Sequence, residues 1–184
     1  GPSRAVIQTG KHSHLNGFME NEHRFDGSQQ TFPKLLQKGG YQTAVIGKWH
    51  LGTDPQGYDF WKVLPGQGTY YAPDFRTPDG LVEGTPGEYV TEAVVTQSIE
   101  WLEKERDQSK PFMLMVQHKA PHRFWLPPVH LLDEYVAKDY PEPENLFDDY
   151  GGRGTPAQTQ DMTLRVTMDL ALDNKMVPFR QDRM

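Results

Sequence analysis

Two short apolar segments restrict the folds open to this chain more than any other feature of its sequence. Residues 41–47 (YQTAVIG) and 112–117 (FMLMVQ) each have the length and the apolar, partly β-branched character of a buried strand. Helical patterns lie at residues 3–9, 31–38 and 88–106. The order helix, helix, strand, helix, strand predicts an α/β fold in which a mostly parallel sheet is flanked by helices.

The longest predicted helix, residues 88–106, has a wide apolar face. The residues of this face recur at helical spacing; they are Val90, Val94, Val95, Ile99, Trp101 and Leu102. Residues 11–27 and 139–156, which are rich in polar residues and Gly, are expected to be loops, and residues 51–87 form a long stretch rich in Gly, Pro and aromatic residues. Two further helices are expected, a weak one at residues 129–137 and another at residues 157–172.

The composition limits the class of protein. A chain of 184 residues can form one sizeable domain, and 11% aromatic residues are more than a disordered chain carries. A net charge of -6 without any basic run argues against nucleic acid as a partner. No stretch approaches the ~20 apolar residues of a membrane-spanning helix. Because these residues include no cysteine, they hold no disulfide, thiolate metal site or cysteine nucleophile.

Three clusters of residues are candidates for chemistry. An arginine lies in the first turn of a predicted helix at residues 1–4, where free N–H groups favour an anion. Residues 47–52 (GKWHLG) and 118–125 (HKAPHRFW) directly follow the two predicted strands, where open α/β sheets bind ligands. Each cluster alone is also compatible with a helix cap, a packed tryptophan or an ordinary loop. Together they indicate a basic concavity for an oxyanion such as sulfate or phosphate, with aromatic rings for a sugar or aryl group.

These residues resemble the signatures of the type I, formylglycine-dependent sulfatases. That family's first signature is Cys or Ser, any residue, Pro-Ser-Arg, four residues and Thr-Gly, and Pro2-Ser3-Arg4 with Thr9-Gly10 matches it from its second position onward. The second signature, GKWHLG, is complete at residues 47–52, and Pro121-His122 follows a strand as a third expected element. The resemblance runs from residue 1 to about residue 170. It implies an alkaline-phosphatase-like sulfatase fold, of which residues 1–184 would be part of the N-terminal catalytic domain, truncated at both ends.

Within this family the chain is most similar to bacterial N-acetylglucosamine-6-O-sulfatases. The similarity rests on residues 117–125 (QHKAPHRFW), 65–75 (PGQGTYYAPDF) and 145–150 (NLFDDY). It implies hydrolysis of 6-O-sulfate esters on N-acetylglucosamine-type sugars, as in the degradation of sulfated glycans. It also implies that the parent protein is periplasmic or secreted in a bacterium.

The resemblance also implies a role for each candidate residue. Arg4 would orient the metal side of the formylglycine, and Lys48 would bind the sulfate oxygens. His50 would hydrogen-bond the formylglycine hydroxyl, and His122 would protonate the leaving oxygen, since its reference pKa of ~6.5 suits a general acid. Rim residues would contact the sugar by stacking or hydrogen bonding; the candidates are Arg123, Trp125, Tyr70, Tyr71 and Asp74.

The chain also departs from the family pattern. The formylglycine precursor would precede Gly1, and the family's Ca²⁺ is held by an upstream acidic pair and a downstream Asp-Asn pair. Asp173-Asn174 follows no apolar strand, and Asp148-Asp149 lies in a predicted loop, so we assign no metal ligand in this chain. A second lysine that the family carries near the downstream pair is also not found. We therefore expect an enzyme as the parent protein and no activity from these residues alone.

Two alternatives remain open at this point. The chain could come from another hydrolase of the alkaline-phosphatase superfamily, such as a phosphodiesterase or phosphonate hydrolase. A Thr, rather than Cys or Ser, encoded before Gly1 would favour that alternative. It could instead be a non-catalytic carbohydrate-binding or structural fragment, which would follow if the gene begins near Gly1. The full open reading frame distinguishes these possibilities.

Overall fold

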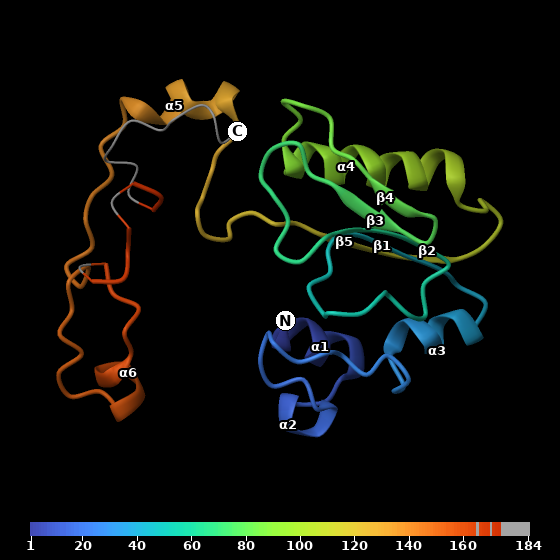
Figure 1. Ribbon diagram of the computed structural model, residues 1–184, viewed down its shortest axis with the longest axis horizontal. Helices are drawn as coiled ribbons and strands as arrows, with labels where there is room; N and C mark the ends of the chain where they lie inside the picture. Colours follow the sequence, from blue (N-terminus) through green and yellow to red (C-terminus); the bar gives the residue numbers. More distant parts are fainter. Residues whose placement is uncertain (165, 170, 174–184) are drawn as a thin grey trace. The chain divides into compact units, whose positions relative to one another are not determined.

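The computed structural model describes residues 1–164, 166–169 and 171–173 (Figure 1). The chain divides into two compact units, one of residues 1–121 and one that begins at His122. Each unit is described by itself. Within the described residues no helix is long and apolar enough to cross a membrane.

The first unit is built on a five-stranded sheet. Its strands lie in the order β4-β3-β2-β1-β5. Strand β1 pairs in parallel with both β2 and β5, whereas β3 pairs antiparallel with β2 and with β4. The strands are β1 (Gln42–Lys48), β2 (Phe60–Leu64), β3 (Phe75–Thr77), β4 (Gly80–Val82) and β5 (Phe112–Gln117).

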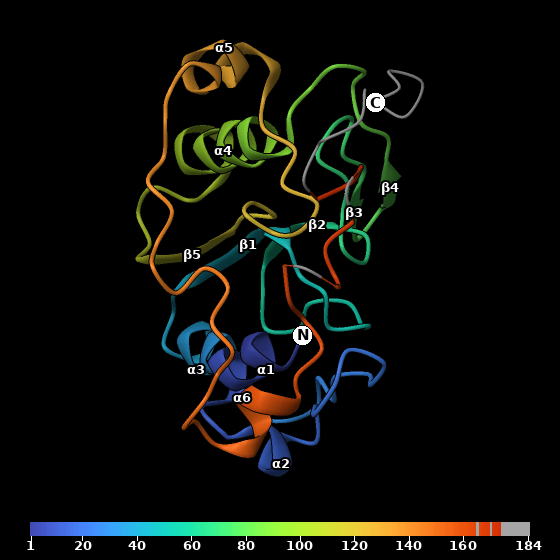
Figure 2. The same ribbon diagram turned by 90° about the vertical axis from the view of Figure 1, so that its left-hand side faces the viewer.

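Helices cover both faces of this sheet. The short helices α1, α2 and α3 lie on one side of the sheet, and α4 lies on the other (Figures 1 and 2). Helix α4 continues into a π-helical segment, η1. The helices are α1 (Pro2–Thr9), α2 (Ser13–Asn16), α3 (Phe32–Lys38), α4 (Val90–Glu100) and η1 (Trp101–Glu105).

Strand β1, which lies between β2 and β5, is buried on both faces of the sheet. Its residues from Thr43 to Lys48 are all buried, as expected for a parallel strand between two helical layers. On the α4 side, the ring of Trp101 is 1% exposed and lies 6.3 Å from the ring of Phe60 and 6.0 Å from that of Phe112. Burying such apolar surface is the main favourable term in folding.

The parallel register brings three strand ends to one edge of the sheet. Lys48 of β1 is paired with Leu64 of β2, and Gly47 is paired with Gln117 of β5. At this edge the backbones of β1 and β5 approach closely. Gly47 has a φ of +105°, and a Cβ there would lie 2.0 Å from the carbonyl oxygen of Gln117. Glycine at this position is therefore required both by conformation and by space.

The second unit contains short helices joined by polar connections. The described elements are η2 (Val129–Leu131), α5 (Leu132–Val136) and α6 (Thr155–Thr159). The carboxylate of Asp173 is buried and forms an ion pair with Arg123, which ties the last described residues to the first residues of the unit. The prediction of a weak helix at residues 129–137 is confirmed by η2 and α5.

The α/β order predicted from the sequence is confirmed, but three expectations are wrong. Residues 11–27, which were expected to be a loop, hold the short helix α2, and residues 51–87, for which no element was predicted, hold three strands. On α4 the predicted apolar face is too wide: Val95 and Ile99 are 40% and 47% exposed, and Ala93 is buried instead. The helix packs through a narrower stripe at i, i+3 and i+4 spacing from Val90.

The helix predicted at residues 157–172 is the third error. Helix α6 ends at Thr159, and the described residues beyond it form turns; residues 165 and 170 lie outside the described part. Polar side chains bind the backbone there in place of a helical ladder. Thr167 accepts a hydrogen bond from the N–H of Thr163, and Asp169 accepts from the N–H groups of two residues that follow it, Ala171 and Leu172.

We predict that Gly47→Ala lowers the free energy of unfolding by at least ~2 kcal/mol, because the added Cβ would collide with the backbone of β5. Gly10→Ala is the matched control. Gly10 also has a positive φ, +67°, but a Cβ there would meet no atom within 4 Å. Its expected loss is only the ~1 kcal/mol of a left-handed residue. Urea unfolding followed by tryptophan fluorescence measures both, and equal losses would contradict the steric explanation.

Candidate functional site

Arg4 joins helix α1 to the carboxyl ends of two strands. Its Nε donates to the backbone carbonyl of Lys48 and to the Oε1 of Gln117, both at 3.0 Å. Burial lowers the pKa of Arg4 from its ordinary value, although an arginine remains charged at any physiological pH. Arg4 therefore places a fixed positive charge where β1 and β5 end.

Lys48 is the last residue of β1, and its side chain is buried. Only 3% of Lys48 is exposed, and its Nζ donates to the Oε1 of Gln67 at 2.5 Å. Gln67 lies in the loop that follows β2. Lys119, in the loop after β5, is 7% exposed and donates from Nζ to the backbone carbonyl of the same Gln67 at 3.1 Å. The loops after all three parallel strands thus meet at this edge.

The cations at this edge repel one another. Burial first, and then the charges of Arg4 and Lys119, lower the pKa of Lys48 from 10.5 to about 8. Burial also lowers the pKa of Lys119. Among the described residues, no Asp or Glu forms an ion pair with any of these three side chains. A group of buried cations without a carboxylate partner is suited to bind an anion.

The other residues of the GKWHLG segment divide between core and site. Trp49 and Leu51 are 3% and 0% exposed, and the Trp49 Nε1 donates to the carbonyl of Thr53 at 2.7 Å. His50 lies between them, half-buried, with a positive φ of 52° that is uncommon outside glycine. Core packing on either side of His50 therefore holds its unusual backbone conformation at the strand end.

The tyrosines predicted at the rim pack among themselves. Tyr70 is 6% exposed, and its ring lies 6.0 Å from that of Tyr89, which in turn lies 5.4 Å from the ring of Tyr71. The Nζ of Lys119 lies 4.8 Å from the centre of the Tyr70 ring, in a cation–π geometry. Burial, with a smaller effect of Tyr89, raises the pKa of Tyr70 to about 12. Tyr70 therefore touches the cation cluster through Lys119.

Asp74 stabilises the loop that leads into β3. Its Oδ1 accepts from the backbone N–H of Gly84 at 2.9 Å. A Cβ at Gly84 would lie 2.3 Å from the backbone of Ala72, so the two chain segments touch here. The position that the sequence predicts as a sugar contact thus also has a local structural task.

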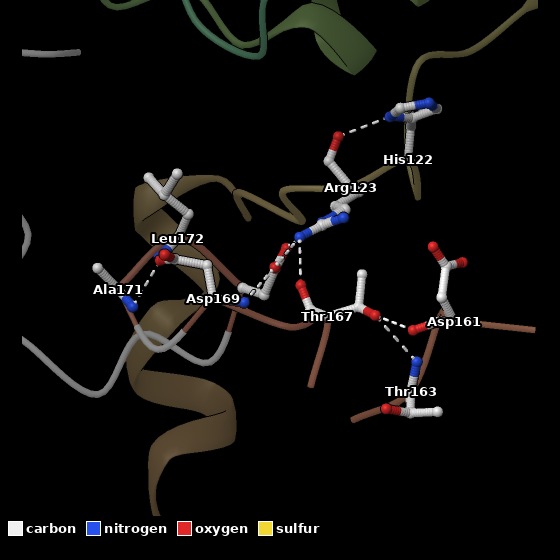
Figure 3. Close-up of polar contacts among 9 residues, drawn as sticks. His122, Arg123, Asp161, Thr163, Thr167, Asp169, Ala171 and Leu172 are labelled. Carbon is white, nitrogen blue, oxygen red and sulfur yellow. Dashed lines mark hydrogen bonds and ion pairs between the residues drawn. The ribbon is translucent and has the colours of Figure 1, made fainter. Parts of the chain in front are cut away.

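The remaining predicted site residues belong to the second unit. The Nδ1 of His122 lies 2.6 Å from the carbonyl oxygen of Arg123 (Figure 3). Trp125 is 39% exposed. Arg123 donates from Nε and Nη2 to the two carboxylate oxygens of Asp173, at 2.7 and 2.5 Å, and from Nη2 to the carbonyl of Thr167 at 3.1 Å. These bonds raise the pKa of Arg123.

The sequence-predicted residues are therefore only partly brought together within one unit. Arg4 and Lys48 adjoin each other, with His50 two residues further along the chain. His122 is described within the second unit, whereas Lys119 belongs to the first. Sequence reasoning missed Gln67, because β2 was not predicted; the apolar residues of Phe60–Leu64 followed by Pro65-Gly66 were the available signal.

The fold and the cation cluster define an α/β protein with a positively charged site at the carboxyl ends of its parallel strands. Comparison with known proteins gives the family. The sulfatase family model matches residues 1–173, and the chain belongs to the sulfatase family. The expected alkaline-phosphatase-like sulfatase fold is confirmed by solved relatives.

Two relatives are particularly similar. An N-acetylglucosamine-6-O-sulfatase of Bacteroides thetaiotaomicron is 51% identical over 180 residues, which is 96% of this chain and 32% of that protein. A protein whose structure was solved in complex with its substrate, D-glucosamine-2-N,6-O-disulfate, superimposes on this chain with a TM-score of 0.90 at 50% sequence identity. The match covers 96% of this chain and 36% of the chain of that protein. A protein solved with k-i-k-neocarrahexaose, at 22% identity and a TM-score of 0.65, covers 76% of this chain and 38% of its own and is similar in fold alone. The chain spans about a third of each of these relatives.

Replacing Lys48 by methionine is predicted to raise the free energy of unfolding at pH 7. The pKa of Lys48 is lowered in the folded chain, so below pH 8 folding buries a charge that the unfolded chain leaves in water. Between pH 8 and 10.5 the folded lysine is neutral, whereas the unfolded one still binds a proton. The free energy of unfolding of the unsubstituted chain therefore rises with pH over this range. The advantage of Lys48→Met should therefore shrink over that range.

The control for Lys48→Met is Lys104→Met. Lys104 is also a lysine, but its side chain is 71% exposed and lies beside Glu100. It should give no gain in stability at pH 7 and no comparable change between pH 8 and 10.5. Urea unfolding at several pH values measures both variants. A loss of stability in Lys48→Met at pH 7 would show that Lys48 stabilises the fold.

Asp173→Asn is predicted to make the end of the second unit more sensitive to thermolysin. The substitution removes the charge that binds the two donors of Arg123, so residues 161–173 should open more often. Asp161→Asn is the matched control, because its side chain is exposed in the same segment. Mass spectrometry of the fragments locates the cuts. Equal cleavage in both variants would contradict a fastening role for the Arg123–Asp173 pair.

Proposed function

We propose that this chain is part of the N-terminal catalytic domain of a sulfatase that removes 6-O-sulfate from N-acetylglucosamine-type sugars. One observation carries the proposal: Arg4, Lys48 and Lys119 adjoin one another at the carboxyl edge of the sheet without a carboxylate partner among the described residues. A sulfate ester carries its charge on non-bridging oxygens, and such cations stabilise that charge during transfer. Family membership and the name of the 51% identical relative support the same reaction.

The roles of the residues follow from this chemistry. Lys48, charged below pH 8, binds sulfate oxygens, and Arg4 adds a charge that does not titrate. His50, two residues after Lys48, acts on the nucleophile's hydroxyl. His122 protonates the leaving alcohol oxygen, a role in which histidine is the most frequent general acid.

The nucleophile that the family signature implies is a formylglycine at the position before Gly1. Gly1 directly precedes α1, and its carbonyl accepts a hydrogen bond from the backbone N–H of Arg4 at 2.9 Å, which supports this placement. A residue attached there would adjoin the cations. When present, a formylglycine supplies a gem-diol oxygen that attacks sulfur. Among the described residues no three His, Cys, Asp or Glu side chains gather as a metal site, so we assign no calcium ligand and derive no step through calcium.

The substrate class rests on the relatives and on the candidate rim. One relative is named for N-acetylglucosamine 6-O-sulfate, and another was solved with a glucosamine that carries 6-O-sulfate. A primary 6-sulfate projects on a CH₂ group, so the sulfate can reach the cations while the ring stays at the rim. Trp125 would stack on the sugar, and Asp74 would accept from a hydroxyl. Arg123 retains Nη1 for such a contact, and Tyr70 and Tyr71 would support the rim through the tyrosine cluster.

The proposal includes a location. Bacterial sulfatases of this type are typically exported, and by this resemblance we propose that the protein lies in the periplasm or outside a bacterial cell. Sulfated carbohydrate is then its only proposed ligand, without nucleic acid.

The test uses the complete product of the gene that encodes this chain. We expect cleavage of N-acetylglucosamine-6-sulfate in preference to 2-O- or 4-O-sulfated sugars, and Lys48→Met should reduce kcat/KM by at least ~100-fold on every sulfate ester. Trp125→Ala and Asp74→Asn should lower kcat/KM on the sugar by about tenfold, with no change on a small aryl sulfate. Asparagine keeps the oxygen that accepts from Gly84, so loop structure is preserved. A preference for 2-O- or 4-O-sulfate would refute the substrate, and no sulfate release would refute the function.

A further inference from the structure

We propose that Gln67 and Lys119 are part of the oxyanion site, with Gln67 as the positioning residue that holds the Lys48 ammonium and Lys119 as a second cation facing the anion. This rests on the proposed function and deepens it, since both residues lie in segments that carry the resemblance but neither is among the residues to which that resemblance assigns a role. Three contacts support this proposal. The Lys48 Nζ donates to the side-chain Oε1 of Gln67, and the Lys119 Nζ donates to the backbone carbonyl of Gln67. The Lys119 Nζ also lies over the ring of Tyr70.

The chemistry of an ammonium fixes how the Gln67 amide is oriented. Lys48 can only donate, so the atom 2.5 Å from its Nζ must be the amide oxygen. The NH₂ group of Gln67 then points away from Lys48. Gln67 is exposed, so these two donors remain available to a ligand oxygen beside the ammonium. One glutamine can thus position the lysine and contribute a donor of its own.

Lys119 is held by neutral groups in the same loop. Its Nζ donates to the Gln67 carbonyl and lies over the Tyr70 ring, and neither contact cancels its charge. An ammonium has three donors, and these contacts leave it able to bind an additional acceptor. Its burial strengthens any interaction with an anion, because the local dielectric constant is lower than that of water.

The two residues should act on the charge of Lys48 in opposite directions. Gln67 stabilises the ammonium as an acceptor, whereas Lys119 destabilises it as a like charge. The charged groups that act on Lys48 are Arg4 from α1 and Lys119 from the loop after β5. The pair therefore sets the highest pH at which Lys48 is charged and can bind a sulfate oxygen.

A titration of Lys48 tests the pair directly. The full chain labelled with ¹³C at lysine Cε reports each ammonium by NMR, and Lys48→Met assigns the resonance. We expect the pKa of Lys48 to fall in Gln67→Ala, because an acceptor is lost. It should rise in Lys119→Met, because a like charge is lost, and also in Gln67→Glu, because a carboxylate is added.

Lys104→Met is the matched control for the loss of charge, since that lysine is exposed and paired with Glu100. It should leave the pKa of Lys48 unchanged. Chemical-shift dispersion reports whether each variant is folded. If Gln67→Ala does not fold, Gln67→Glu still tests the inference, because glutamate has nearly the same shape as glutamine. An unchanged Lys48 pKa in folded Lys119→Met and Gln67→Glu would overturn the inference.

The kinetic arm uses the complete gene product and a small aryl sulfate. The pH above which kcat/KM falls should be lower in Gln67→Ala and higher in Lys119→Met than in the unsubstituted protein, because it follows the pKa of Lys48. At pH 7 both variants should lose at least about tenfold in kcat/KM. Unaltered kinetics in both would also overturn the inference. If the pKa of Lys48 responds as expected but the wild-type protein releases no sulfate, the proposed function fails and the electrostatic pair stands.

Discussion

The parallel alignment of β1 between β2 and β5 is the constraint on which the rest of the first unit depends. It ends three strands at one edge, and the close approach at Gly47 fixes how near β1 and β5 can lie. Arg4 then bonds to both strand ends through a single Nε. Because the backbone sets these positions, the basic side chains adjoin one another without an ion pair to hold them in the part of the chain that the structure describes.

This arrangement opposes folding at neutral pH. A buried lysine beside other cations has a lowered pKa, which means that the folded chain binds the proton of Lys48 less tightly than the unfolded chain does. An apolar side chain of similar volume would relieve the strain, as it often does where buried ions are replaced. A bound anion would relieve it too, and would raise the pKa of Lys48 as it bound. In the proposed site, the unfavourable electrostatics of the anion-free protein would thus add to its affinity for an anion.

The sequence could predict the elements whose pattern is strong, and with them part of the site. The apolar runs of β1 and β5 predicted where these two strands end, and therefore that Lys48 lies at the end of β1. Arg4 was predicted separately, in the first turn of a helix. Strands β2, β3 and β4 are at most five residues long and lie in a Gly/Pro-rich stretch, where periodicity carries little information. Gln67 was not predicted as a site residue for that reason. A glutamine between two glycines can be assigned to the strand edge only when β2 is known to end there. Residues 157–172 failed because threonine and aspartate side chains bind the backbone there, an effect that depends on local geometry.

The basic side chains differ in the groups that bind them, and this difference distinguishes a structural role from a role in binding an anion. Lys48 and Lys119 are bound by an amide, a carbonyl and an aromatic face, all of which orient an ammonium and leave its charge intact. Arg123 is bound by both oxygens of Asp173, so most of its charge is already balanced within the second unit. A cation held by neutral partners can still attract an oxyanion, whereas a cation held by a carboxylate mainly fastens two segments together. By this criterion the anion site that we propose lies at the ends of β1, β2 and β5, whereas Arg123 chiefly fixes the loop that carries His122 and Trp125 within the second unit.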